Sequence, residues 1–152
     1  MNRVWAYTIS RSLGDPELEN LLNAGNAFVK RWTAHDQQLS ASFEIFKKKI
    51  ILVKVNEEVT GASGCSIDKL TRFVKETEQT FHVELMNRLL VAHQNGENIE
   101  ITHASKIKEL LNQGTVTENT IVYNTSLAND SELMDWEQPL KNTWLNKYLQ
   151  TP

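Results

Sequence analysis

The chain has 152 residues, of which 40% are hydrophobic, and a formal net charge of −3. This length fits one folded domain, because a chain of this size buries roughly 70% of the surface that it exposes when unfolded. With 16 basic and 19 acidic residues, no strong positive field favours nucleic acid, so we expect no nucleic-acid partner. The sequence has no secretory signal and no apolar run of about 20 residues, so we expect a soluble, cytoplasmic protein without membrane insertion.

The first third of the chain predicts strands around one long helix. Residues 4–9 (VWAYTI) are rich in β-branched and aromatic types and predict a strand. Asp15 is a candidate N-cap, and Pro16 would then hold the first helical position. Helical spacing places on one face Leu18, Leu21, Leu22, Gly25, Phe28, Val29 and Trp32. Residues 40–46 and 49–55 predict two strands joined by a lysine-bearing turn, the second central in a sheet.

The rest of the chain predicts shorter elements. A second helix is expected at about 66–80, and Asn95-Gly96 predicts a hairpin within 88–102. A short helix near 104–112 would end at Gly114, and 120–124 predicts a strand. A helical pattern covers about 131–149, where Pro139 marks a break or begins another helix. No linker divides these elements, so we expect one α+β domain over 1–152, with a mixed or antiparallel sheet of about five to six strands and three to four helices.

The only cysteine, Cys65, lies in the glycine-bearing segment 57–68, just before a predicted helix. A thiol at a helix start feels the partial positive charge of unsatisfied N–H groups, which favours the nucleophilic thiolate. One hypothesis is therefore a cysteine-dependent enzyme with Cys65 as nucleophile, His35 as base, and Asp68 or Glu58 as the group that orients the base. Asp68 in the first helical turn would oppose thiolate formation, because its negative charge offsets that field.

A packing role is the alternative for Cys65. With Ser66 as N-cap, Cys65 precedes the cap and Leu70 holds the fourth helical position, which is the arrangement of a hydrophobic staple. We favour this interpretation, because a cysteine nucleophile also needs a base and an orienting partner. A single cysteine forms no internal disulfide, which agrees with a reducing compartment.

The same segment is the predicted binding surface. Glycines allow a ligand to approach the backbone closely, and helix N–H groups bind phosphate or carboxylate. The expected binding residues are Arg11, Glu58, Gly61, Ser63, Gly64 and Ser66, beside His35. The leading hypothesis is thus a module that binds an unidentified small molecule or protein, with homo-oligomerisation left open. We expect no cofactor, and no metal site because metal-ligand spacing is lacking among His35, His82, His93 and His103.

Aromatic side chains offer a second candidate surface. Trp5, Trp32, Trp136 and Trp144, with Tyr7 and Tyr148, could line a ligand pocket. Aromatic residues at helical or strand spacing more often pack in a core, so we interpret them as packing residues.

Four segments together resemble a known family: WAYTISR (5–11), FVKRWTAH (28–35), ASGCSID (62–68) and the region from NTIVYN to ELMDWEQPLKNTWL (119–145). The family consists of small uncharacterised bacterial proteins, some of which carry the label "ABC transporter ATPase". The resemblance implies no reaction and no catalytic residues, since none is established for the family. Because the chain lacks the phosphate-loop motif G-x-x-x-x-G-K-[ST], we expect no ATP hydrolysis. An accessory protein of such a transporter is a further hypothesis.

Overall fold

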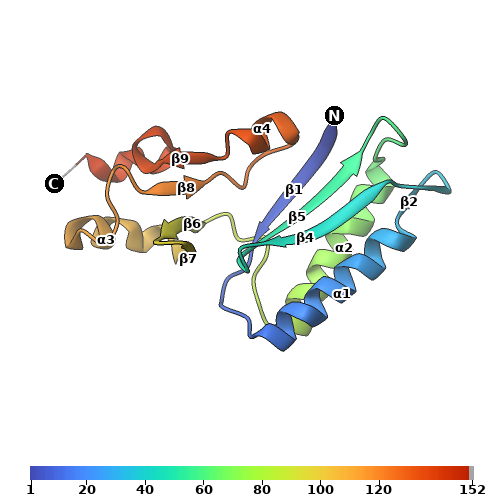
Figure 1. Cartoon of the computed structure of the whole chain (residues 1–152), viewed down its shortest axis with the longest axis horizontal. Helices are drawn as coiled ribbons and strands as arrows, with labels where there is room; N and C mark the ends of the chain where they lie inside the picture. Colours follow the sequence, from blue (N-terminus) through green and yellow to red (C-terminus); the bar gives the residue numbers. More distant parts are fainter. Residues whose placement is uncertain (151–152) are drawn as a thin grey trace.

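The chain forms three antiparallel sheets, and two long helices cover one side of the first sheet (Figure 1). The computed structural model describes residues 1–150. The elements of the first half are β1 (Asn2–Thr8), α1 (Asp15–Arg31), β2 (Thr33–Ala34), β3 (Gln37–Gln38), β4 (Ala41–Phe46), β5 (Ile50–Asn56) and α2 (Gly64–Phe81). Those of the second half are β6 (Leu90–Asn95), β7 (Asn98–His103), η1 (Ala104–Lys106), α3 (Ile107–Gln113), β8 (Ile121–Tyr123), α4 (Asp130–Met134), β9 (Glu137–Pro139), η2 (Leu140–Asn142) and η3 (Trp144–Leu149), where η marks a 3₁₀ helix.

The first sheet has the order β1-β5-β4, so β5 is its central strand as predicted. Side chains alternate across a strand, and both faces of β5 are buried. Ile51 and Val53 belong to the core under α1 and α2, whereas Ile50 and Leu52 belong to the core on the opposite face. This explains why the strand is a continuous apolar run.

Helix α1 packs very closely on the first sheet. A Cβ atom added at Gly25 would lie 2.2 Å from Cδ1 of Phe43, a residue of β4. Glycine at this position therefore sets the approach of the helix to the sheet. The predicted cap is wrong by one residue, because Gly14 is the N-cap and its N–H donates to Oε1 of Glu17 at 3.1 Å.

The second sheet has the order β7-β6-β8-β9 and packs against the face of the first sheet that the long helices leave free. Aromatic rings fill this contact: the ring centroids of Tyr123 and Trp136 lie 5.0 Å apart, and Phe46 lies 5.0 Å from Trp136. The outer face of the second sheet is covered by α3, η2 and η3 through Ile107, Leu140 and Leu145. The shared core joins both sheets into one α+β domain.

The predicted α+β class and antiparallel pairing are confirmed, and the four α-helices agree with the prediction of three to four. The strands form three sheets rather than the one sheet predicted. These are the three-stranded sheet, the four-stranded sheet and a separate hairpin of β2 and β3, which have two residues each. A continuous helix over 131–149 is not found: α4 has only five residues and β9 follows it. The expected break at Pro139 is found, because β9 ends there and the 3₁₀ helices η2 and η3 follow. Within residues 1–150, none of the helices has both the length and the apolar character needed to cross a bilayer.

Candidate functional site

The packing role predicted for Cys65 is wrong, because its side chain is exposed. Helix α2 begins earlier than expected. Ser63 is its N-cap, and its Oγ accepts the N–H of Ser66 at 3.1 Å. Cys65 is therefore the second residue of the helix rather than the residue before its cap, and no staple with Leu70 forms.

The predicted catalytic groups do not form a hydrogen-bonded set. His35 lies in the turn between β2 and β3, where its φ of 51° places it in the left-handed region. Both His35 and Asp68 are exposed, and in residues 1–150 the thiol of Cys65 forms no hydrogen bond with either of them. A base held within hydrogen-bond reach of the nucleophile, which this chemistry requires, is thus lacking.

The polar groups of the 57–68 segment are largely used by the segment itself. The N–H of Ser63 donates to Oγ of Ser66 at 2.7 Å, and Ser66 is fully buried, with its carbonyl accepting from Nε1 of Trp32 at 2.8 Å. The side chain of Glu58 pairs with the N-terminal amino group at 3.2 Å and is 78% exposed. A Cβ at Gly64 would meet nothing within 4 Å, and one at Gly61 would reach only Oε2 of Glu57 at 3.5 Å. These contacts build a helix start and leave no enclosed site.

Arg11 does not lie beside this segment, so that prediction is wrong. Its guanidinium donates to the carbonyls of Phe81 at 2.7 Å and His82 at 3.2 Å, at the C-terminal end of α2. The 57–68 segment is at the other end of this 18-residue helix, about 27 Å away at 1.5 Å per residue. Arg11 also pairs with Glu17 at 2.8 Å, and this hydrogen bond raises its pKa and lowers that of Glu17. Its role is to cap α2 and tie it to α1.

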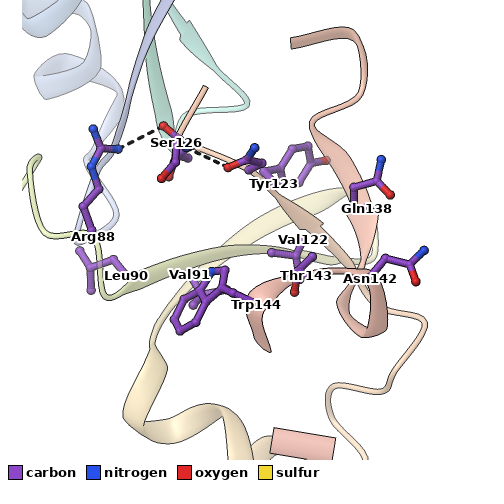
Figure 2. A pocket seen from close by; sticks show the side chains of 12 residues that line it. Arg88, Leu90, Val91, Val122, Tyr123, Ser126, Gln138, Asn142, Thr143 and Trp144 are labelled. Atoms are coloured by element: carbon purple, nitrogen blue, oxygen red, sulfur yellow. Dashed lines mark hydrogen bonds between the residues drawn. The ribbon is translucent and has the colours of Figure 1, made fainter. Parts of the chain in front are cut away.

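A pocket of about 290 Å³ lies instead on the second sheet. Its lining comes from four separate segments: Arg88, Leu90 and Val91 at the start of β6; Val122, Tyr123, Asn124, Thr125 and Ser126 in and after β8; Gln138 in β9; and Asn142, Thr143 and Trp144 at the junction of η2 and η3. Figure 2 shows Arg88 and Leu90 on one side, Gln138 and Asn142 on the other, and Trp144 between them. We call this cavity the Arg88–Trp144 pocket.

The floor of the pocket is apolar and its rim is polar. Val91 and Val122 are buried in the outer core of the second sheet. Val122 pairs with Gln138 in the β8–β9 ladder, so their side chains lie on the same face. Trp144 is 50% exposed. The interpretation of Trp144 as a core packing residue is therefore wrong, because a core residue would be buried.

Backbone contacts hold Arg88 at the edge of this pocket. Its Nη1 donates to the carbonyl of Thr125 at 3.1 Å and to that of Ala6, in β1, at 3.4 Å. Burial raises the pKa of Tyr7 to about 12, and the positive charge of Arg88 acts in the opposite direction. Arg88 therefore links the pocket to the edge of the first sheet.

One signal in the sequence points to this site. Trp144 is among the candidate pocket aromatics, and its exposure separates it from Trp32 and Trp136, which are 1% and 7% exposed. Arg88 carries no motif that would single it out. Among residues 1–150, no group of three or more His, Cys, Asp or Glu side chains could hold a metal ion.

No family model matches this sequence, and no curated protein or solved structure matches the chain. The family resemblance and the transporter hypothesis that comes with it stay predictions.

Proposed function

We propose that this protein is a binding module for a small organic molecule, and that its ligand site is the Arg88–Trp144 pocket. The observation that carries the proposal is a cavity of about 290 Å³ with an apolar floor and a polar rim. Ligand sites in proteins share this character, and their volumes begin at about 300 Å³. A cavity of this size suits a molecule smaller than a typical drug.

The lining favours binding over catalysis. It contains no carboxylate, imidazole or thiol, which are the groups that most often act as general acid, general base or nucleophile. A guanidinium presents N–H donors and no acceptor, so Arg88 can attract and orient a ligand. The hydroxyl of Thr143 donates to the carbonyl of Leu140 at 2.8 Å and is occupied by that bond.

The pocket replaces the 57–68 segment as the proposed location of binding. None of the predicted binding residues Glu58, Gly61, Ser63, Gly64 and Ser66 lines the pocket, and the polar groups of the two serines already cap α2. A ligand at the segment would have to compete with these internal bonds, whereas at the pocket the side chains of Asn142 and Trp144 are exposed at the rim.

Thermal stabilisation by a fragment library tests this proposal, because a ligand that prefers the native state raises its apparent stability. The variant Trp144→Ala removes one wall of the pocket at an exposed position, and Gly64→Ala is the matched control in the 57–68 segment. We expect fragments that stabilise the wild type and Gly64→Ala equally and lose their effect on Trp144→Ala. Fragments that still stabilise Trp144→Ala but not Gly64→Ala would move the site to the segment, and a library without any hit would refute the proposal.

A cysteine-dependent reaction is the second candidate, favoured only by the exposure of Cys65 at the start of α2. A reactive thiolate would alkylate at neutral pH faster than a free cysteine does. A rate equal to or below that of free cysteine removes this candidate.

A further inference from the structure

We infer that the ligand of the Arg88–Trp144 pocket carries an amide group, which takes the place of a backbone pair that β6 and β8 do not form. The N–H of this amide bonds to the carbonyl of Leu90, and its C=O accepts the N–H of Thr125. This ligand class rests on the proposed function of the pocket and goes beyond it by naming the chemical group that is recognised.

The pocket lies where strands β6 and β8 part. Ala92 pairs with Tyr123, and the same antiparallel register would place Leu90 opposite Thr125, two residues further along each chain. That pair does not form, because the segment after β8 runs toward β1, whose backbone bonds to the carbonyl of Ala128. Both Leu90 and Thr125 line the pocket. The gap in the ladder therefore belongs to the pocket.

The carbonyl of Leu90 faces this gap. The N–H of Ala104 donates to the carbonyl of Leu89 at 2.7 Å. Val91 pairs with Thr102 in the same ladder, so Leu89 and Val91 both direct their backbone groups toward β7. Because the N–H and C=O of a trans peptide point in opposite directions, the carbonyl of Leu90 points away from β7 and toward the segment after β8. Within residues 1–150 this carbonyl accepts no hydrogen bond outside the strand ladders.

The N–H of Thr125 faces the same gap from the other side. The preceding residue, Asn124, donates its N–H to the carbonyl of Trp136 at 2.8 Å, on the β9 side. Successive residues of an extended chain direct their backbone groups to opposite sides, so those of Thr125 lie on the β6 side. The carbonyl of Thr125 accepts Nη1 of Arg88 there at 3.1 Å, a bond drawn in Figure 2. Its N–H has no acceptor in the part of the chain that the structure describes.

An amide matches these two groups. A trans amide presents its N–H and its C=O in opposite directions, as a donor toward Leu90 and an acceptor toward Thr125 require. Backbone groups of folded proteins are nearly always paired, and leaving one unpaired in a binding site costs affinity. The apolar floor of Val91 and Val122 suits a hydrocarbon group attached to the amide.

A matched pair of probes tests the inference: N-cyclohexylacetamide and cyclohexyl acetate, titrated into the ¹⁵N-labelled full chain by NMR. They share the ring and the carbonyl, and the ester has an oxygen in place of the N–H. We expect the amide to bind the wild type about tenfold more tightly or better, because the ester leaves the carbonyl of Leu90 without a donor. On saturation with the amide, the N–H proton of Thr125 should move downfield, because it gains an acceptor.

Two variants test the other end of the amide. Thr125→Pro removes the N–H, whereas Thr125→Ala keeps it. The amide should bind Thr125→Pro about fivefold more weakly or worse than Thr125→Ala, whose affinity should equal that of the wild type.

Equal affinity of the amide and the ester for the wild type would overturn the inference, as would equal affinity of the two variants for the amide. If neither probe binds while the fragment library gives Trp144-dependent hits, the ligand class is wrong and the proposed function stands. The wild-type comparison and the shift of the Thr125 proton decide the matter even where Thr125→Pro does not fold.

Discussion

The two sides of this molecule differ in the length of their elements. On the side built from α1, α2 and the first sheet, which we call the regular side, helices of 17 and 18 residues cover strands of six to seven residues. The side built from the second sheet consists of strands of three to six residues and 3₁₀ turns. Short elements cannot cover their sheet fully, and the pocket lies where they meet. The candidate site therefore lies on this second side, which we call the irregular side.

The first prediction concerns whether the two sides of the molecule unfold separately. Leu21 and Leu140 are both fully buried, one on each side. Replacing either by Ala should cost about 3 kcal/mol, because it leaves a cavity in a core. Since a shared core joins the sheets, we expect both variants to lower the midpoint of one common thermal transition. Two transitions in Leu140→Ala, with the helical circular dichroism signal lost last, would show that the sides are independent.

The second prediction concerns the tight packing of the regular side. Gly25→Ala should destabilise the protein by about 1–3 kcal/mol, because the new methyl group would overlap the ring of Phe43. Gly64→Ala is the control, since a Cβ there meets nothing within 4 Å, and it should change stability by less than about 0.5 kcal/mol. Chemical denaturation measures both. Equal effects of the two substitutions would mean that α1 does not pack on β4 as described.

The third prediction uses a buried histidine of the irregular side. His93 is 2% exposed and its Nε2 lies 2.8 Å from Oγ1 of Thr102. Burial lowers its pKa, while the carbonyl of Gln94 and the charge of Glu100 act to raise it. The unfolded state therefore binds a proton below about pH 6.5 that the folded state does not, so stability should fall on acidification, by at most about 1.4 kcal/mol per pH unit for this group.

Comparing His93→Gln with His35→Gln isolates this effect, because His35 lies exposed in a turn. Between pH 7.5 and 5.5 the loss of stability should persist in His35→Gln and shrink in His93→Gln. A pH dependence that is the same in both variants would mean that His93 titrates normally.

The smallest expected effect concerns Cys65. Its exposed thiol should react with a disulfide reagent such as Ellman's reagent in the folded protein, and Cys65→Ser should change the free energy of unfolding by less than about 0.5 kcal/mol. A thiol that reacts only after denaturant is added would restore the packing interpretation and would show that the regular side is more tightly closed here than the structure indicates.

The sequence predicted the regular side because its elements are long and periodic. The apolar face of α1 and the continuous apolar run of β5 repeat often enough to identify a helix and a buried strand. The helix over 131–149 failed for the opposite reason. Trp136 and Leu140 fit helical spacing, but the carbonyl of Trp136 accepts from Asn124 at 2.8 Å and the N–H of Leu140 donates to Thr120 at 2.8 Å. Bonds to the chain beside β8, which spacing does not reveal, hold Glu137–Pro139 extended as β9, between α4 and the 3₁₀ helices η2 and η3.

The pocket could not be predicted for a related reason. Its walls come from residues 88–91, 122–126, 138 and 142–144, which only the fold brings together. Arg88 precedes a strand in a segment without a motif, and Trp144 fits the spacing of a core residue. The glycines and cysteine of the 57–68 segment are typical of a functional loop, but local sequence cannot show that Ser63 and Ser66 hydrogen-bond to each other.

We propose that ligands enter the Arg88–Trp144 pocket and not the 57–68 segment. A ¹H–¹⁵N NMR titration of the full chain, with a fragment that stabilises the wild type in the thermal screen, tests this. We expect saturable shifts of the backbone amides of Leu90, Val91, Asn124, Thr125, Ser126 and Trp144, with the amides of Glu58, Gly61 and Gly64 unmoved. Saturable shifts confined to residues 57–68 would contradict it.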